Sequence, residues 1–424
     1  MSTSTAARRA APLAEILLQA TQVVVTVMAG RTPDAALGRV ALPLRPATME
    51  AVYTALRAYG RADFFLARLM DRPLKDAEVR ALLLLALNRL ERAPDDAYRV
   101  VDQAVTAAQS LANGRFKGVV NGVLRNFMRQ RIELVQAAQA DSVATWQHPL
   151  WWIERVQRDH PDRWRDILAA GNTHPPLVLR VNRRRLASAD FLTQLDAVGI
   201  AARRLDDAAV LIEKAVAVDA IPGFRAGLCS VQDWGAQSVP QRLELQDGLR
   251  VLDACAAPGG KTAHLLETND LELTALDVDA ARTLRIRQNL DRLGLHATIK
   301  TADACAVASW WDGRPFDRIL ADVPCSASGV ARRHPDAKWL RRETDVADLA
   351  QRQTAILEAL WPTLAPGGKM LYVTCSVFEQ ENSAQVHDFL VRHKDARRAD
   401  ASLPTALLPN AEHDGFFFVL LQKA

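Results

Sequence analysis

The sequence is poor in cysteine and has no long apolar run. Its five cysteines are odd in number and widely spaced, and no C-x-x-C pair occurs, so neither a disulfide scaffold nor a zinc site is indicated. We therefore expect a reducing, cytoplasmic environment and no bound metal. No apolar stretch has the roughly 20 residues that a membrane-spanning helix needs. The segment 11–29 comes closest, but it contains Glu15 and Gln19 and lacks a small-residue cleavage site, which favours a buried helix over a signal peptide.

Internal repeats and low-complexity segments are also absent. The 424 residues exceed the usual size of one domain, roughly 100–200 residues, so two or three domains are expected. With 49% hydrophobic and 24% charged residues, the composition is that of a soluble globular protein rather than a disordered chain or a fibre. We expect a monomer that does not bind membranes.

Positive charge is concentrated in the first third of the chain. Residues 1–140 carry 19 Lys and Arg against 12 Asp and Glu, whereas residues 141–246 carry 13 against 13 and residues 247–424 carry 21 against 24. A basic front end on a near-neutral body fits a polyanionic partner. Charge alone does not separate this interpretation from an ordinary solvated surface.

Hydrophobic periodicity divides the chain into three parts. Residues 7–131 show helical spacing throughout and no period-two pattern, which predicts an all-helical domain over residues 1–140. Residues 141–246 combine a connector, whose tryptophans we expect to be core rather than a stacking surface, with a small α+β module. Over residues 247–424 strand-like and helical stretches alternate, which predicts a parallel, doubly wound α/β domain. Ligands in such sheets bind beyond the carboxyl ends of the strands.

The expected strands of both sheets are short. In the α+β module they are 177–181, 210–212 and 229–232, with a helix over 189–198, and in the C-terminal domain they are 250–254, 272–278, 297–301, 317–322, 369–375 and 415–421, with helices over 280–293 and 346–364. Most of the C-terminal strands are followed directly by polar or cysteine-containing motifs. The chemistry is therefore expected at one edge of that sheet.

The motif DACAAPGGKT, residues 253–262, follows the strand that begins at Arg250. Its two adjacent glycines and two alanines allow backbone N–H groups to approach a ligand closely. It is not a P-loop, because Cys255 stands where that motif needs a glycine five residues before Gly260, and no G-x-G-x-x-G is present either. The motif predicts a cofactor loop, with a simple tight turn as the alternative.

Two aspartates on the following strands are candidates to complete this site. Asp277 ends the next strand, 17 residues after Gly260, where a carboxylate can accept hydrogen bonds from both hydroxyls of a ribose. Its alternative role is to cap the following helix, but Asp279 suits that cap better and leaves Asp277 for the ribose. Asp303 follows the third strand, and binding an adenine amino group and capping a turn are equally good interpretations of it.

Two cysteines follow the fourth and fifth strands. Cys325 lies in DVPCSASGV, residues 322–330, and Cys375 lies in VTCSVFEQEN, residues 373–382. A single cysteine is most often a small buried apolar residue. Two cysteines at the carboxyl ends of adjacent strands, beside a cofactor loop, instead indicate reactive thiols. Lys261 is a candidate for the positive charge that a thiolate needs.

Together these motifs resemble those of the RNA cytosine-5 methyltransferases, and the resemblance covers nearly the whole chain. The front end, including KGVVNGVLR at 117–125, resembles the RNA-binding domain of the antitermination factor NusB. LRVN at 179–182, SVQDWGAQ at 230–237 and DGFFFVLL at 414–421 are also similar to stretches of the family. One departure is Asn88-Arg89, where an aromatic residue followed by glutamine is expected, and it leaves the RNA contacts of the front domain open.

The resemblance implies a Rossmann-like methyltransferase domain that uses S-adenosylmethionine, and a cytosine of small-subunit (16S) ribosomal RNA as the substrate. It implies that Cys375 is the nucleophile, that Cys325 assists product release, and that Asp322 touches the cytosine amino group as well as the cofactor. With Lys261, these three are the implied catalytic residues. The implied cofactor-binding residues are Ala254, Cys255, Ala256, Ala257, Pro258, Gly259, Gly260, Lys261, Asp277, Asp303 and Asp322.

A cytosine ring explains why two cysteines are needed. Carbon 5 of cytosine is a poor nucleophile, but a thiolate added at carbon 6 makes carbon 5 enamine-like and able to attack a methyl sulfonium. The carbon-5 proton and the enzyme must then leave.

Two other hypotheses remain. A DNA cytosine-5 methyltransferase would attack with the Pro-Cys cysteine, here Cys325, whereas the Thr374-Cys375-Ser376 element points to RNA. The other is a non-catalytic RNA-binding assembly factor that retains the fold.

The target cytosine is expected to lie in a loop or to flip out of its helix. A thiolate reaches carbon 6 of a stacked, paired base only with difficulty. We expect the phosphates that flank the target to be held by the basic residues after the fourth strand: Arg332, Arg333, Lys338, Arg341 and Arg342.

Overall fold

The computed structural model describes residues 12–399 and 404–424, which form two compact units. The helical unit consists of the chain up to Thr173 together with the segment His334–Arg342. The sheet unit consists of His174–Arg333 and Glu343–Ala424. The mixed architecture expected from the sequence, an all-helical front end followed by a small α+β module and a Rossmann-like sheet, is confirmed.

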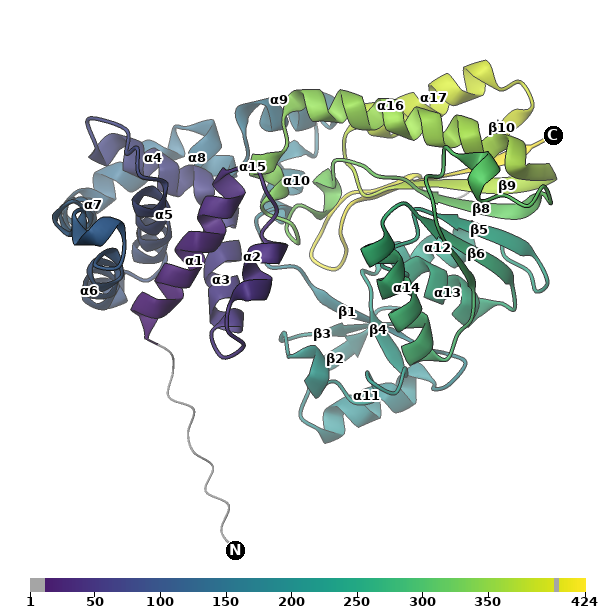
Figure 1. Cartoon of the computed structure of the whole chain (residues 1–424), viewed down its shortest axis with the longest axis horizontal. Helices are drawn as coiled ribbons and strands as arrows, with labels where there is room; N and C mark the ends of the chain where they lie inside the picture. Colours follow the sequence, from purple (N-terminus) through teal and green to yellow (C-terminus); the bar gives the residue numbers. More distant parts are fainter. Residues whose placement is uncertain (1–11, 400–403) are drawn as a thin grey trace, which may run out of the picture. The chain divides into compact units, whose positions relative to one another are not determined.

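The front part of the helical unit contains seven helices (Figure 1). They are α1 (Leu13–Met28), α2 (Asp34–Arg39), α3 (Arg45–Arg57), α4 (Tyr59–Leu69), α5 (Ala77–Arg92), α6 (Ala97–Ala108) and α7 (Lys117–Gln139). Three short helices follow, namely α8 (Ser142–Trp146), α9 (Leu150–Asp159) and α10 (Trp164–Ala170). The expected helical pattern is therefore present from α1 onward, and the part of the prediction that falls on residues 7–11 lies outside the described residues.

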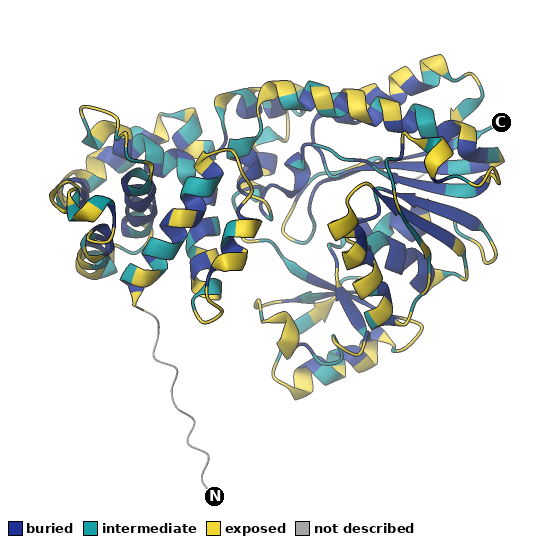
Figure 2. Cartoon of the chain, viewed as in Figure 1, coloured by how far each residue is buried: buried dark blue, intermediate teal, exposed yellow. Residues whose placement is uncertain are grey.

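Helix α5 forms the centre of this unit. Asp76 caps its first turn by accepting a hydrogen bond from the backbone N–H of Val79 at 3.0 Å. Ten of its 16 residues are buried, and Figure 2 shows the helix almost wholly in the buried colour. Its central residues 81–88 are all buried, and α1, α4, α6 and α7 pack around them.

The segment His334–Arg342 belongs to the helical unit although the chain around it belongs to the sheet unit. It contains the short helix α15 (Ala337–Leu340). The ring of Trp339 packs on Tyr59 with centroids 4.8 Å apart, and its Nε1 donates to the carbonyl of Leu56. Lys338 is fully buried, and its Nζ donates to Asn172 Oδ1 at 2.8 Å. This burial lowers the pKa of Lys338 well below its usual value.

The small sheet of the sheet unit has the order β2-β3-β1-β4, with antiparallel neighbours throughout. Its strands are β1 (Leu177–Val181), β2 (Ala202–Arg204), β3 (Ala209–Ile212) and β4 (Cys229–Val231), and α11 (Ser188–Ala197) covers it. Alternate residues such as Leu179 and Val181 pack into one core with Phe191 of α11.

The large sheet has the order β10-β12-β9-β8-β5-β6-β7, with β11 paired to β12. Its strands are β5 (Arg250–Ala254), β6 (Glu272–Asp277), β7 (Thr298–Thr301), β8 (Phe316–Asp322), β9 (Leu364–Thr374), β10 (Ala396–Arg398), β11 (Ala406–Leu407) and β12 (Phe416–Lys423). The five strands from β9 to β7 in this order run parallel, and β12 is antiparallel to β9.

Helices cover both faces of this sheet. Figure 1 shows α16 (Glu343–Leu360) and α17 (Ser383–Arg392) along one face, and α12 (Val239–Arg242), α13 (Gly260–Thr268) and α14 (Ala280–Leu293) on the other. Successive residues of β5 accordingly enter different cores: Val251 packs with α13 and α14, and Leu252 packs with α16 and α17. This double covering explains why the strands are nearly continuous in apolar residues.

Three edge strands were not predicted from the sequence. Strands β2 and β10 both read Ala-Arg-Arg and are largely exposed, so they carry no apolar alternation. Backbone pairing with β3 and β12 alone makes them strands. Strand β11 spans two residues and is fixed in the same way by β12.

Candidate active site

The cofactor loop lies at the point where the strand order of the large sheet reverses. Strand β5 pairs with β6 on one side and with β8 on the other, so connections leave it in opposite directions. Ligands of doubly wound sheets bind in the crevice that such a reversal creates at the carboxyl ends of the strands. The loop from Cys255 to Gly259 begins at this end of β5, and α13 starts at Gly260.

The loop is folded tightly on one side and open on the other. Gly259 has φ +94°, and a Cβ there would lie 3.1 Å from the backbone of Ile286, so this position requires glycine. At Gly260 a Cβ would meet nothing within 4 Å. The loop therefore offers its backbone to open space at Gly260, beside the N-terminus of α13, as a ligand-binding loop must.

Asp277 holds the loop in place, a role that the sequence did not reveal. It is nearly buried at the end of β6, and its Oδ2 accepts a hydrogen bond from the backbone N–H of Ala257 at 3.1 Å. Arg282 lies 3.6 Å from the same carboxylate and donates to the carbonyl of Ala257. Asp279 caps α14 through the N–H groups of Ala281 and Arg282, as predicted, whereas the ribose contact of Asp277 stays a prediction.

Asp303 follows β7 and takes part in a turn. Its Oδ1 accepts a hydrogen bond from the backbone N–H of Cys305 at 3.0 Å. Of the two interpretations left open by the sequence, turn capping is therefore present in the structure. It engages only Oδ1, so the carboxylate retains acceptor capacity for a ligand amino group.

Asp253 is a buried carboxylate that sequence reasoning did not single out. It is fully buried at the end of β5, where its Oδ2 accepts the hydroxyl of Thr262 at 2.6 Å. Its Oδ1 has no hydrogen-bond partner among the described residues. Burial raises the pKa of Asp253 to about 7. The one hint of this contact in the sequence is the motif DACAAPGGKT. Asp253 begins it on the strand, and Thr262 ends it on the following helix.

Lys261 and Asp322 form an ion pair at the mouth of the site. Lys261 Nζ lies 2.7 Å from Asp322 Oδ2, and the side chains remain 17% and 28% exposed. Burial by itself lowers the pKa of Lys261, but the charge and hydrogen bond of Asp322 outweigh it and raise that pKa. The ammonium is therefore retained, and the negative charge of a Cys375 thiolate adds to the same effect.

The two cysteines meet at the ends of β8 and β9. The Sγ atoms of Cys325 and Cys375 are 3.3 Å apart, and both side chains are partly exposed. The hydrogen bond to Cys375, followed by burial, raises the pKa of Cys325 well above its usual value. The geometry thus favours a pair in which Cys325 keeps its proton and donates it toward Cys375. By contrast, burial raises the pKa of Cys255 in the cofactor loop to about 12, so that thiol is unreactive.

Glu381 ties the two cysteine-bearing loops together. It is fully buried, and its Oε2 accepts hydrogen bonds from the hydroxyls of Ser326 at 2.5 Å and Ser376 at 2.6 Å. Its Oε1 accepts the backbone N–H of Ser326 at 2.8 Å and the Nε2 of Gln353 at 3.0 Å. Since Ser326 and Ser376 directly follow the two cysteines, one carboxylate fixes the distance between the sulfur atoms.

The expected phosphate contacts after the fourth strand were wrong for three of the five residues. Arg332 is buried and forms an ion pair with Asp414, which is itself fully buried. Arg333 pairs with Asp414 and with Asp233. Lys338 lies within the helical unit, as described above. These cations are used to hold the chain together, because buried charges must be paired or hydrogen-bonded.

The DGFFFVLL stretch owes its position to a close backbone approach. A Cβ at Gly329 would lie 2.4 Å from the carbonyl oxygen of Gly415, so both segments need glycine where their backbones cross. The backbone N–H of Gly415 donates to the carbonyl of Gly329. This crossing, with Asp414 beside it, anchors the loop that carries Cys325.

Two features are absent from the described residues: a cluster of metal-ligating side chains and an apolar helix of membrane-spanning length. Within residues 12–399 and 404–424, no group of three His, Cys, Asp or Glu side chains is arranged to hold a metal ion. In the same residues no helix combines the length and apolarity needed to cross a bilayer.

Comparison with known proteins identifies the family. Residues 240–422 match the family model described as 16S rRNA methyltransferase RsmB/F, residues 148–219 match its ferredoxin-like domain, and residues 27–129 match the NusB family. The chain is 41% identical to ribosomal RNA small subunit methyltransferase B of Serratia proteamaculans over 390 residues, which are 89% of this chain and 90% of that protein. The corresponding protein of Pseudomonas putida is 42% identical over 395 residues, with the same coverage.

The chain belongs to the RsmB/F methyltransferase family. The crystal structure of PH0851 covers 97% of the chain with a TM-score of 0.80 at 22% identity, which shows the same fold. A methyltransferase homologue from Pyrococcus horikoshii covers 67% of the chain with a TM-score of 0.58 at 25% identity. RsmB/F proteins are methyltransferases, and S-adenosylmethionine is the cofactor of this enzyme.

The residues of this chain fit that cofactor. The loop after β5 is open at Gly260, a carboxylate stands at the end of β6, and Asp253 Oδ1 is buried without a partner beside the loop. These are the backbone donors and carboxylate acceptors that a nucleoside with a charged amino acid tail requires.

Proposed function

We propose that this RsmB/F methyltransferase methylates carbon 5 of a cytosine in small-subunit ribosomal RNA through a covalent bond between Cys375 and carbon 6. The single observation that carries the proposal is the pairing of Cys325 and Cys375, with sulfur atoms 3.3 Å apart, beside the ion pair of Lys261 and Asp322. Carbon-5 chemistry needs one group to attack and another to help remove the proton, and this site contains both.

Cys375 is assigned as the nucleophile because a cation and a hydrogen-bond donor lie beside its sulfur. Lys261 carries a positive charge that interacts with the charge of Cys375, and Cys325 offers it a hydrogen bond. A thiolate is stabilised by both interactions. Cys325 is the poorer nucleophile, because the raised pKa of its thiol keeps it protonated at neutral pH.

The reaction then follows from these assignments. The Cys375 thiolate forms a bond to carbon 6, and the electron pair of the C5–C6 double bond makes carbon 5 nucleophilic. S-adenosylmethionine, when bound, supplies the methyl group that carbon 5 takes. A base then removes the carbon-5 proton, the C5–C6 double bond re-forms, and Cys375 leaves as a thiolate.

Cys325 is suited to the release step. In the resting site the hydrogen bond to Cys375 is the first cause of its raised pKa, burial is the second, and the charge of Cys375 adds to both. The covalent bond to carbon 6 removes that charge, so the pKa of Cys325 falls in the adduct. Cys325, which is partly exposed, can then pass its proton to solvent water and, as a thiolate, accept the proton from carbon 5. We assign to Asp322, which pairs with Lys261, the hydrogen bond from the cytosine amino group.

The cysteines give the test of the proposal. Cys375→Ala is expected to abolish both methylation and any covalent protein–RNA complex. Cys325→Ala still allows attack and methyl transfer, but the adduct is not resolved, so a covalent complex accumulates. Denaturing electrophoresis of each variant with labelled small-subunit ribosomal RNA and S-adenosylmethionine measures both outcomes. Cys229 belongs to β4 of the small sheet, and Cys229→Ala is the matched control, expected to behave like the unmodified enzyme.

A DNA-type mechanism predicts the reverse assignment. In that case Cys325→Ala loses the adduct and Cys375→Ala retains it. An assembly factor without catalysis forms no adduct in any variant. A trapped complex in Cys375→Ala but not in Cys325→Ala therefore overturns the roles proposed here.

A further inference from the structure

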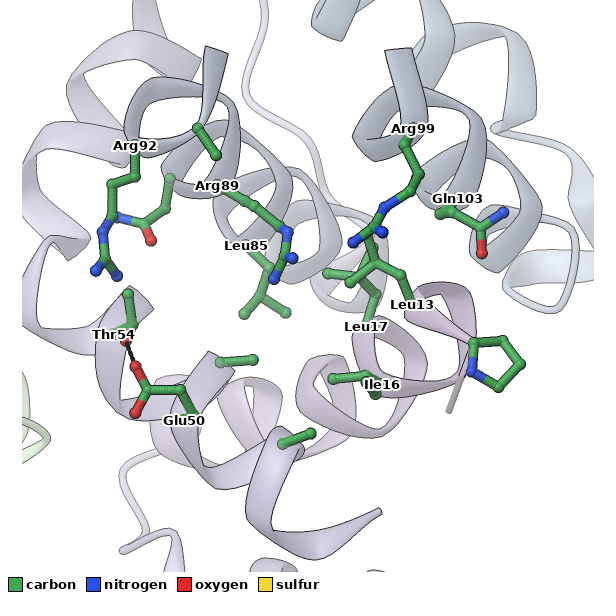
Figure 3. A pocket seen from close by; sticks show the side chains of 15 residues that line it. Leu13, Ile16, Leu17, Glu50, Thr54, Leu85, Arg89, Arg92, Arg99 and Gln103 are labelled. Carbon is green, nitrogen blue, oxygen red and sulfur yellow. Dashed lines mark hydrogen bonds between the residues drawn. The ribbon is translucent and has the colours of Figure 1, made fainter. Parts of the chain in front are cut away.

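The helical unit contains a cavity of about 780 Å³ that is remote in the sequence from the active-site motifs. It is formed by helices α1, α3, α5 and α6 (Figure 3). Its apolar wall includes Leu13, Leu17 and Leu85, all of which are buried. A cavity of this volume falls in the range of ligand sites, roughly 300–1,000 Å³.

The charge around this cavity is positive. Arg89, Arg92 and Arg99 line it against a single acidic residue, Glu50. Figure 3 shows the side chains of Arg89 and Arg99 reaching toward the same space, with Arg92 on the side of Glu50. Arg99 and Arg89 both pair with Asp96, at 3.2 Å and 4.0 Å, whereas Arg92 makes no ion pair within residues 12–399 and 404–424. The site therefore has positive charge to offer an anion.

Asn88 provides the second, independent observation. Its side chain lines the cavity and is only 4% exposed, yet it makes no hydrogen bond within the described part of the chain. A side-chain amide on so buried a residue usually has its hydrogen bonds completed by protein, ligand or water. The amide can donate two hydrogen bonds and accept two, which is the pattern needed to bind the edge of a nucleobase.

We propose that this cavity binds one nucleotide of a single-stranded segment of the RNA substrate, with the base against the leucines and Asn88 and the adjoining phosphates at Arg89, Arg92 and Arg99. Unpaired bases of RNA are recognised by apolar or guanidinium surfaces together with hydrogen bonds to their edges. The two residues in which this sequence departs from the expected family pattern, Asn88 and Arg89, both line the cavity. The inference rests on the proposed function, since it takes ribosomal RNA as the substrate.

Three substitutions test the cavity in the full-length protein, with a fluorescently labelled single-stranded fragment of small-subunit ribosomal RNA as the probe. Arg92→Ala is expected to weaken RNA binding about three- to ten-fold. The slope of log affinity against log salt concentration should become shallower by about one unit, because one phosphate contact is lost. Ala47→Trp adds a ring at the exposed edge of the cavity without changing charge. It should weaken binding at least about five-fold and leave the salt dependence unchanged.

Asn88→Ala separates ligand binding from a structural role. Because the amide has no partner in the described structure, its removal should not lower the unfolding temperature, whereas RNA affinity should fall at least about five-fold. Arg72, exposed on a loop of the same unit, supplies the control, and Arg72→Ala should change affinity less than two-fold. Photo-crosslinking of 4-thiouridine RNA should label a peptide of α3 or α5, and Ala47→Trp should abolish that label.

The results separate this proposal from the proposed function. If Ala47→Trp and Asn88→Ala bind RNA like the unmodified enzyme, the cavity is not a nucleotide site, even if Arg92→Ala weakens binding through general charge. Continued methylation by the unmodified enzyme in that case leaves the proposed function standing. If the unmodified enzyme methylates no ribosomal RNA, the proposed function itself fails.

Discussion

Asp277 holds the cofactor loop and is also our candidate for the ribose contact. Its Oδ2 holds the N–H of Ala257, so removing the carboxylate affects both the loop and the ribose that we assign to it. Asp277→Ala is expected to weaken S-adenosylmethionine binding by roughly 1–3 kcal/mol, measured by calorimetry. Asp279→Ala is the matched control, because it removes only the cap of α14 and should lower stability by about 1 kcal/mol without changing cofactor affinity. Equal affinities for Asp277→Ala and the unmodified enzyme would rule out the assignment.

Asp253 predicts a pH dependence of stability. Burial raises its pKa in the folded protein to about 7, against about 3.9 in the unfolded chain, so the folded state holds the proton more strongly. The resulting stabilisation is complete below the unfolded pKa and is lost as pH rises through 7. Between these values the slope is at most about 1.4 kcal/mol per pH unit.

The substitution Asp253→Asn isolates this effect. The amide oxygen can still accept the hydroxyl of Thr262, but no proton is exchanged. The difference in unfolding free energy between the variant and the unmodified enzyme should therefore grow in favour of the variant from pH 4 to pH 7 and level off above it. Urea denaturation at several pH values measures this difference, and a difference that does not vary with pH would contradict the raised pKa.

At the scale of elements, the catalytic pair depends on a carboxylate six residues after Cys375 that also binds the loop of Cys325. Glu381→Ala leaves the hydroxyls of Ser326 and Ser376 and a backbone N–H without their acceptor. The loops at the ends of β8 and β9 are then free to separate. A displacement of about 1 Å at a reacting group lowers a rate roughly 100-fold. We expect kcat to fall by that order while S-adenosylmethionine affinity is unchanged.

A matched control lies two residues away. Glu379 is partly exposed and accepts a hydrogen bond from the hydroxyl of Ser383, the first residue of α17. Glu379→Gln should retain full activity. Rates of iodoacetamide labelling at Cys375 and Cys325, followed by mass spectrometry, report directly on the pair and should change only in Glu381→Ala. Full activity in Glu381→Ala would show that the network does not position the cysteines.

At the scale of the whole molecule, neither of the two units is one continuous stretch of the sequence. The segment His334–Arg342 interrupts the sheet unit in sequence but is packed in the helical unit through Lys338 and Trp339. Deleting the chain before His174 would leave these two side chains without their partners Asn172 and Leu56. Removal of the front end therefore affects a segment that directly follows the loop of Cys325.

This arrangement predicts the behaviour of two truncated proteins. Residues 174–424 with the native segment should aggregate or melt at a lower temperature than the same protein with residues 334–342 replaced by a Gly-Ser linker. For a protein of this size each kcal/mol changes the melting temperature by roughly 2–4 °C. Thermal denaturation compares the two, and calorimetry with S-adenosylmethionine verifies that each retains the cofactor site. Equal melting temperatures would show that the buried contacts of the segment contribute nothing.

The sequence by itself determined the elements and the place of the chemistry. The run Val79–Leu87 had to form a buried helix, and the motifs after β5, β6, β8 and β9 had to meet, because parallel strands bring their carboxyl ends to one edge. That rule depends only on local patterns and on the direction of the strands. It placed Lys261, Asp322 and the two cysteines within reach of one another without knowledge of any contact.

Only the tertiary structure decided which charges are available and which are enclosed. Arg332 and Lys338 look like surface cations in the sequence, but Asp414 and Asn172, residues far away in the chain, enclose them. The burial of Asp253 and the edge strands β2 and β10 depend in the same way on distant partners. Burial and edge pairing are properties of what packs against a residue, and no local period in the sequence records them.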